Sequence, residues 1–239
     1  MTGPPAPIAM IVVTAVIVGT AIAVGGRFVL RGLPEPTLPG DADDVLRAEY
    51  AAKISYRSLA RPRFLLGAAS FGVLGMIVAS IAAPQQTLGC WLVFSTVAVL
   101  LAAIDAATTW LPSGLIYRGW GAMTVTAAIA VITAGSDRWT LLITILGGAA
   151  IAGVGYLLLW RLTGGRAIAF GDVRLMPMVG AVAGTLGWPG LYWSILLGSV
   201  VGAVIGIVRL VLRRRGAFPY APALVAGPYA AALLLRALP

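Results

Sequence analysis

The sequence predicts an all-α polytopic membrane protein with about eight transmembrane helices. Of its 239 residues, 60% are hydrophobic and only 10% are charged, and apolar runs of membrane-spanning length recur along the chain. Most of the arginines fall in the short segments between these runs, where they indicate orientation across the membrane. No internal repeat or interdomain linker divides residues 1–239, so a single membrane domain is expected.

The first apolar run, residues 7–25, is predicted to be a span with its N-terminus outside. Met1 to Ala6 carry no Lys or Arg, so the run lacks the basic segment of a cleavable secretory signal. Residues 26–63 form the one long polar segment, and its seven basic side chains place it in the cytoplasm. These are Arg27, Arg31, Arg47, Lys53, Arg57, Arg61 and Arg63.

An amphipathic helix is predicted inside this loop, over residues 41–60. Acids occupy its first turns, basic residues follow at i, i+4 spacing towards its end, and Pro62 is expected to stop it. One interpretation is that this helix lies on anionic membrane lipid. The alternative is that its acidic cluster attracts a basic segment of a substrate. The cluster comprises Asp41, Asp43 and Asp44.

Seven further spans are predicted, which makes residues 64–239 a helical bundle. With the N-terminus outside, alternation puts fifteen Lys and Arg residues in the cytoplasm and leaves only Arg138 and Arg236 outside. The seven tryptophans fall at or near span ends, as in an interfacial aromatic belt. Glycines spaced by four, at 180–184 and 198–206, favour close helix packing. The seven spans are 64–83, 90–110, 115–134, 139–160, 173–188, 190–210 and 221–238.

Composition excludes several classes of function. A net charge of +9 is compatible with nucleic-acid binding, but that function needs a basic face with polar or aromatic readers, and these arginines lie in short loops. The single cysteine, Cys90, excludes an internal disulfide and a cysteine-cluster zinc site. The chain has no histidine, which removes the commonest metal ligand and the usual general base. Any catalysis must therefore rest on carboxylates, and no metal or other cofactor is expected.

Two of the eight carboxylates, Asp105 and Asp172, stand alone against hydrophobic spans. Asp105 lies towards the cytoplasmic end of the third predicted span and Asp172 begins the sixth, so both should lie at similar depth. If they converge away from water, they should share one proton and titrate as a unit. The ionised member of such a pair can take a proton from water while the protonated member polarises a peptide carbonyl.

The neighbours of Asp172 suggest supporting roles. Gly171 is expected to provide backbone freedom and room for a substrate chain, and Arg174 to bind lipid phosphate or the substrate backbone. The alternative for Asp172 is a helix N-cap, which aspartate serves well. Asp105 is harder to explain structurally, because an acid within an apolar run needs a partner or a proton.

Three separate segments resemble the type IV prepilin peptidases, a family of membrane aspartyl proteases of the GxGD type. Residues 105–112 are similar to the first catalytic segment of the family, an aspartate seven residues before the proline of a Leu-Pro pair. Residues 169–175 resemble the GxGD-x-K-L segment, with Ala169 at the first glycine and Arg174 at the lysine. Residues 218–227 resemble the Pro-Phe-Gly-Pro stretch that opens the last span of the family.

The resemblance implies that Asp105 and Asp172 are the catalytic pair, with Gly171, Arg174 and Pro112 supporting the loop or the substrate. It implies an endopeptidase of the bacterial inner (cytoplasmic) membrane that removes the leader of prepilin or pseudopilin-like substrates at the cytoplasmic face. The partners would be membrane lipids and substrates with a basic leader followed by an apolar helix, without nucleic acid. Some longer members also methylate the new N-terminus and carry Cys-x-x-Cys pairs. Residues 26–63 contain no cysteine, which argues against zinc and against methyltransferase activity.

Two other hypotheses stay open. A proton-coupled transporter would use the two acids as a relay, but it would favour inverted repeats and polar residues at the midplane, which the sequence lacks. A catalytically inactive scaffold for pilus or secretion assembly is the other, because Ala169 replaces a glycine of the motif.

Overall fold

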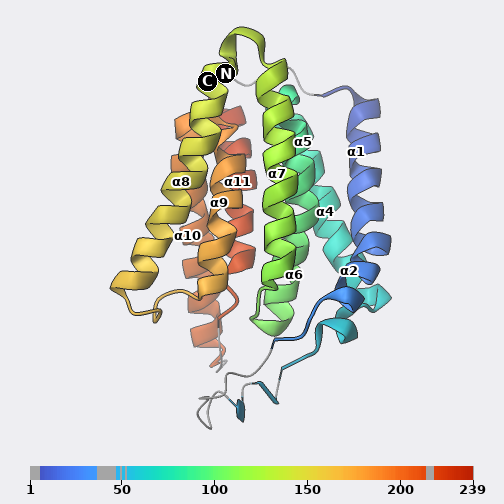
Figure 1. The fold of residues 1–239 in the computed structure, drawn as a ribbon, viewed down its shortest axis with the longest axis vertical. Coiled ribbons are helices and arrows are strands. Elements are labelled where there is room, and N and C mark those ends of the chain that lie inside the picture. The colour runs from blue at the N-terminus through green and yellow to red at the C-terminus, as the bar shows by residue number, and fades with distance from the viewer. Residues whose placement is uncertain (1–5, 37–46, 49, 52, 214–217, 239) are drawn as a thin grey trace.

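The computed structural model describes residues 6–36, 47–48, 50–51, 53–213 and 218–238, and every regular element within them is a helix. The long helices run up and down in one bundle (Figure 1). The first helix begins at the end of the bundle where the last helix finishes.

The N-terminal half of the bundle contains four helical rods. The first is continuous, with a short π-helical stretch in its middle, and the second packs along it. The third rod also contains a π-helical stretch. The elements are α1 (Ile8–Thr20), η1 (Ala21–Gly25), α2 (Gly26–Gly32), η2 (Tyr56–Leu59), α4 (Pro62–Ala82), η3 (Gln85–Thr87), α5 (Leu88–Val93), η4 (Phe94–Ala98), α6 (Val99–Thr108) and α7 (Ser113–Thr133).

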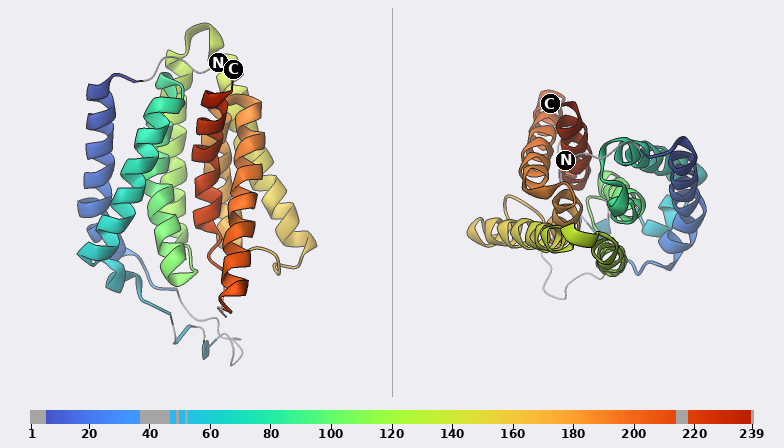
Figure 2. Two further views of the ribbon diagram at one scale, coloured as in Figure 1. Left: turned by 180° about the vertical axis from the view of Figure 1, so that it is seen from behind. Right: turned by 90° about the horizontal axis from the view of Figure 1, so that it is seen from above.

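The C-terminal half contains two closely packed helix pairs, α8 with α9 and α10 with α11 (Figure 2). The last helix, α11, also packs against α4, α6 and α9, so it joins the two halves. The elements are η5 (Gly135–Asp137), α8 (Arg138–Leu162), α9 (Phe170–Gly184), α10 (Gly187–Val211) and α11 (Ala221–Ala237).

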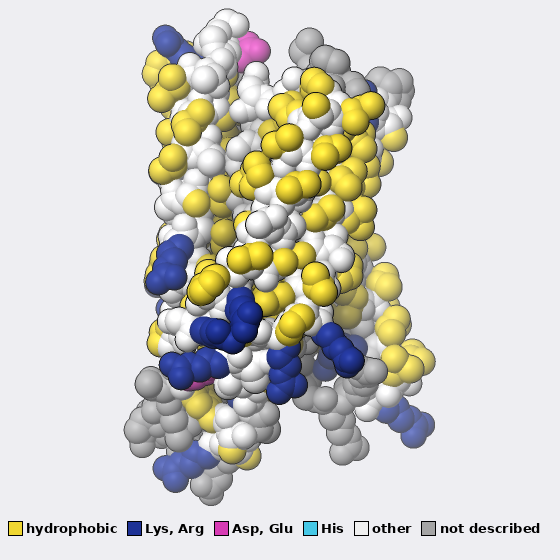
Figure 3. Space-filling view, turned by 90° about the vertical axis from the view of Figure 1, so that its right-hand side faces the viewer, with side chains coloured by type: hydrophobic (Ala, Val, Ile, Leu, Met, Phe, Trp, Pro, Cys, Tyr) yellow, Lys and Arg dark blue, Asp and Glu magenta, His cyan; other side chains and the backbone are white. Residues whose placement is uncertain are grey.

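Within the part of the chain that the structure describes, six helices are long and apolar enough to cross a membrane, against the eight predicted, and they indicate a multi-pass membrane protein. The other two predicted spans are present as the shorter helices α9, with 15 residues, and α11, with 17. At 1.5 Å per residue, α9 extends about 22 Å, less than the hydrocarbon core of about 30 Å. Figure 3 shows an apolar surface on the α1 side of the bundle, with Lys and Arg side chains gathered at its lower end.

The segment between the first two long helices differs from its prediction. The first rod continues to Gly32, past the predicted boundary at residue 25, and Pro62 opens α4 instead of stopping a preceding helix. Proline suits this first helical position, because a backbone N–H there has no partner within the helix and its absence costs nothing. Residues 37–46, including the acidic cluster, lie outside the described residues. Within the described part, 53–55 are not helical, so the helix predicted over 41–60 does not reach its expected end.

Glycines at the helix contacts have the packing role that their spacing predicted. A Cβ on Gly180 would fall on the carbonyl of Gly148, and one on Gly184 on the carbonyl of Thr144, so α8 and α9 are in backbone contact. Gly198 likewise faces the backbone of α11, whereas Gly206 has nothing within 4 Å and takes no part.

Trp91 is a correction to the predicted aromatic belt. Its side chain is completely buried, and its Nε1 donates a hydrogen bond of 3.0 Å to the hydroxyl of Thr185 at the end of α9. Its ring also contacts Phe94 and Tyr229 inside the bundle. Trp139 and Trp188, by contrast, are exposed at helix ends, as an interfacial belt requires.

Candidate active site

Asp105 lies in the last turn of α6, and its side chain is 4% exposed. Its Oδ2 accepts a hydrogen bond of 3.0 Å from the backbone N–H of Ala221, the first residue of α11. The N–H groups of a first helical turn have no partner within the helix, and the helix dipole is positive there. The N-terminus of α11 therefore holds this carboxylate.

Asp172 is the third residue of α9 and is also 4% exposed. Its carboxylate interacts with the backbone N–H of Ala169, which is the N-cap residue of α9. An acid at this position reaching back to the N-cap N–H is half of a capping box. The alternative that Asp172 is itself the N-cap is therefore wrong, although a capping interaction is present. The carboxylates of both candidate acids are therefore bound by backbone N–H groups at a helix N-terminus, that of α11 for Asp105 and that of α9 for Asp172.

The structure brings Asp105 and Asp172 within electrostatic range of each other. They come from α6 and α9, which are both packed against α11. A second link runs through the turn after α6, because a Cβ on Gly171 would lie 3.0 Å from the Cβ of Leu111. The two segments are thus adjacent although they are far apart in the sequence.

The turn between α6 and α7 is held by Thr108 and Thr109, which no sequence pattern singled out, together with Pro112, which the sequence predicted. The Thr108 Oγ1 donates to the carbonyl of Ile104 at 2.8 Å and accepts from the N–H of Trp110 at 3.2 Å. Thr109 has φ 57°, which is left-handed, and so ends α6. Pro112 then caps α7 in an extended conformation. This geometry presents Leu111 to the start of α9.

Gly171 lies within α9, and the Arg174 side chain lies over an aromatic ring. Gly171 has an ordinary helical backbone within α9, so it serves close contact with Leu111 instead of backbone freedom. The Arg174 guanidinium lies 4.5 Å from the centre of the Phe170 ring. The Arg174 carbonyl accepts a 3.0 Å hydrogen bond from Trp120 Nε1, which ties α9 to α7.

The segment after α2 folds back over this site through Glu35. Its Oε1 accepts a 2.8 Å hydrogen bond from the N–H of Tyr56, and its Oε2 lies 3.6 Å from the Nζ of Lys53. The Nζ lies 3.9 Å from the centre of the Tyr56 ring and 5.2 Å from that of Trp110. The Lys53 side chain is only 6% exposed, so the segment from Lys53 to Tyr56 is anchored on the α6–α7 turn.

Burial lowers the pKa of Lys53, and the charge of Glu35 opposes that shift. Burial also raises the pKa of Tyr56, and the charges of Glu35 and Asp105 add to it. Tyr56 is therefore close enough to Asp105 to respond to its charge. No sequence pattern predicts this proximity, because Tyr56 lies 49 residues before Asp105 in a polar loop.

Three hydroxyl side chains lie near Asp172. The Tyr156 side chain of α8 interacts with Tyr220, with Ser199 of α10 and, electrostatically, with Asp172. These residues sit in apolar helices where no motif marks them. Among the residues that the structure describes, no three His, Cys, Asp or Glu side chains are grouped to hold a metal ion. The site is thus two acids, helix N-termini and neutral hydroxyls.

The model of a protein family described as the type IV leader peptidase family matches residues 92–207, which contain both aspartates. The prepilin leader peptidase/N-methyltransferase of Stutzerimonas stutzeri is 38% identical over 90 residues, 34% of this chain and 30% of that protein. The protein of the same name from Aeromonas salmonicida (strain A449) is 41% identical over 76 residues, 28% of this chain and 25% of its own. That of Klebsiella pneumoniae is 30% identical over 146 residues, 58% of each chain.

The chain therefore matches between 25% and 58% of the length of these relatives. None of the solved structures matches it. The matched segment carries α6 and α9, and thus the two buried acids. Through this segment the chain is similar to the type IV leader peptidase family.

Proposed function

We propose that this protein is an aspartyl endopeptidase of the bacterial cytoplasmic membrane that removes the leader of prepilin or pseudopilin-like precursors. The observation that carries the proposal is the pair of buried carboxylates, Asp105 and Asp172, held at helix N-termini within electrostatic range of each other. The relatives named prepilin leader peptidase support the choice of substrate.

In the proposed reaction the pair carries one proton. The ionised carboxylate takes a proton from water, whose oxygen bonds to the scissile carbonyl carbon, while the protonated carboxyl donates its hydrogen bond to the carbonyl oxygen. Collapse of the tetrahedral intermediate breaks the C–N bond, and a proton passes to the leaving amine. The two acids suffice for each transfer, so no histidine or metal takes part.

The proposed topology has eight spans in one membrane domain, with the N-terminus outside and α9 and α11 completing the passages. Figure 3 supports it, because the Lys and Arg side chains on that face gather at the end of the bundle opposite the start of α1. Both aspartates lie towards that end, which favours cleavage at the cytoplasmic face. It disfavours a proton relay, which would need acids spread across the membrane.

We propose cleavage alone, of substrates that carry a basic leader before an apolar helix. Residues 26–63 contain no cysteine pair, so the second activity in the names of the relatives is not carried over. No nucleic-acid partner is proposed, and membrane lipid is the surrounding partner. The Ala169 N-cap is compatible with an ordered α9, so it does not favour an inactive scaffold.

The test is to express the full chain with Asp105→Asn or Asp172→Asn beside a prepilin and to follow removal of the leader. Each variant should lower cleavage about 10²–10⁴-fold, because the pair then lacks one proton-transfer group. Asp137→Asn is the matched control, since this acid is exposed in the turn before α8. Normal processing by either active-site variant, in protein that inserts normally, would refute the proposal.

A further inference from the structure

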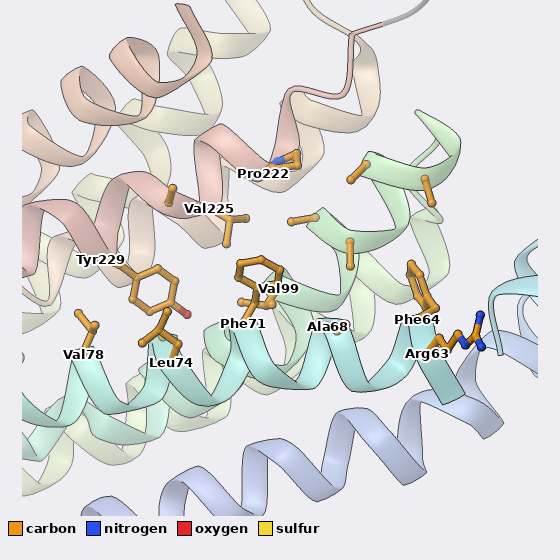
Figure 4. A pocket seen from close by; sticks show the side chains of 17 residues that line it. Arg63, Phe64, Ala68, Phe71, Leu74, Val78, Val99, Pro222, Val225 and Tyr229 are labelled. Carbon is orange, nitrogen blue, oxygen red and sulfur yellow. The ribbon is translucent and has the colours of Figure 1, made fainter. Parts of the chain in front are cut away.

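An apolar groove of about 720 Å³ runs between α4, α6 and α11. Figure 4 shows side chains of these helices facing the common space, with Phe64, Phe71 and Leu74 along the α4 side and Pro222 and Val225 on the α11 side. Phe71 and Leu74 are 70% and 58% exposed, so large apolar side chains line an unfilled hollow.

The groove meets the candidate active site. Its α6 wall consists of Ala102, Ala103, Ala106 and Ala107, which surround Asp105 in the sequence of the same helix. Its α11 wall begins at Pro222, next to the Ala221 N–H that binds the Asp105 carboxylate. A molecule lying in the groove with one end at Pro222 would therefore end beside Asp105.

The lining selects an apolar occupant of helical shape. Arg63, at the start of α4, is the one charged residue among those that line the groove. The alanines of α6 leave room for close backbone approach, which is the small-residue surface that transmembrane helices use to pack together. Lipid chains do not require such a surface.

A second apolar hollow, of about 420 Å³, lies between α7, α8 and α9 and serves as a comparison. Its α9 lining begins at Pro177, more than a turn beyond Asp172, and it includes Trp120 and Met123 of α7. It neither contains a neighbour of Asp105 nor reaches Pro222. The groove beside α6 is the one that is continuous with the acids.

We propose that the α4–α6–α11 groove is the docking site for the apolar helix that follows the scissile bond of the substrate. This inference rests on the proposed peptidase function. A segment within lipid must satisfy its own backbone hydrogen bonds and so remains helical. When the substrate helix docks in the groove, the unwound residues at its cytoplasmic end lie beside Asp105. The leader then extends into the cytoplasm.

Gly67 of α4 allows the groove to be filled without strain. It lines the groove, is exposed, and a Cβ built on it meets nothing within 4 Å. Gly121 of α7 is the matched control, because it is also exposed in a 21-residue helix with nothing within 4 Å and lines neither hollow. Gly67→Trp and Gly121→Trp therefore change the same chemistry at different places.

The assay compares two synthetic peptides cut by the full chain in proteoliposomes. Both carry a basic leader and the cleavage site of a prepilin; the long one continues through its apolar helix, and the short one ends just after the site. The measured quantity is kcat/KM for the long peptide divided by kcat/KM for the short peptide. Gly67→Trp should lower this ratio about tenfold or more, because the long peptide loses one well-buried apolar contact. Gly121→Trp should leave the ratio at the wild-type value. Equal ratios in the two variants would overturn the docking site.

Photo-crosslinking separates docking from catalysis. A benzophenone amino acid replaces Phe71 in the Asp105→Asn protein, and the probe is the long peptide. A crosslink to the apolar helix of that peptide, competed by unlabelled long peptide, is expected. Crosslinks to lipid only would overturn docking while leaving the peptidase proposal intact. If the wild type cuts neither peptide, the peptidase proposal fails, and the crosslink still decides whether the groove binds an apolar helix.

Discussion

Gly180→Ala tests whether backbone contact between α8 and α9 positions the acid on α9. A Cβ at Gly180 would fall on the Gly148 carbonyl and lie 2.7 Å from the Cβ of Ala152, and a backbone carbonyl cannot swing aside as a side chain can. Helix α9 must therefore move away from α8 and carry Asp172 with it. We expect weaker cleavage together with lower stability.

The magnitude follows from a comparison with Gly206→Ala on α10, where nothing lies within 4 Å. Both substitutions gain about 0.5–1 kcal/mol because alanine favours helix more than glycine does. Overpacking at a helix contact costs about 1–3 kcal/mol. The gain cancels in the difference, so Gly180→Ala should be about 1–3 kcal/mol less stable than Gly206→Ala.

The measurement is reversible unfolding of the full chain in mixed micelles, followed by tryptophan fluorescence, with peptide cleavage assayed in parallel. Equal unfolding free energies for the two variants would refute the close α8–α9 contact. Equal stability with normal cleavage would also show that Asp172 does not depend on this contact for its position.

Three further predictions concern the loop anchor, its dependence on pH and the buried tryptophan. Glu35→Ala removes the acceptor of the Tyr56 N–H and the partner of the Lys53 ammonium, so proteolytic cutting within residues 26–63 should accelerate; unchanged cutting would contradict the anchor. Burial lowers the pKa of Lys53 from 10.5 in the anchored loop. At pH values between this lowered pKa and 10.5, the anchored loop therefore binds fewer protons than the released loop. Proteolysis of the wild-type loop should therefore slow as the pH rises through this range up to 10. Above pH 10 the raised pKa of Tyr56 destabilises the anchored loop as the pH rises, so proteolysis should no longer slow. Trp91→Phe leaves the buried Thr185 hydroxyl without its donor, which should cost about 1–3 kcal/mol and lower the Tm of the detergent-solubilised protein; an unchanged Tm would contradict it.

Each of the eight apolar runs of the sequence falls on a helical segment of the described chain, six of them of membrane-spanning length and two shorter, because length and hydropathy are properties of each segment alone. The helix ends were harder to predict. The first rod runs through Arg27 and Arg31 to Gly32, since a helix can leave the membrane without a break. Apolar length did not predict the start of α9 either, because α9 begins at Phe170, three residues before the predicted run 173–188.

The two acids of the candidate site were predicted from the sequence because an acid in an apolar run is unusual, whereas their surroundings were not. The Ala221 N–H comes from a residue 116 positions away, and its role depends on where α11 begins. Tyr56 reaches the same acid from a loop that carries no motif. Contacts of this kind depend on how helices are arranged, which periodicity does not specify.

The groups that hold the two acids bear on how the pair can work. Within the described residues, neither Asp105 nor Asp172 forms an ion pair with Lys or Arg. A cation in contact would hold its acid permanently ionised, and the pair would lose the shared proton that the proposed reaction needs. The N–H groups of Ala221 and Ala169 provide only partial charges, which orient each carboxylate while leaving it free to accept a proton. Arg174 is the cation nearest to Asp172 in the sequence, and its guanidinium lies over the Phe170 ring, 4.5 Å from the ring centre. Helix N-termini can therefore fix two acids in a dry place without ending their exchange of a proton.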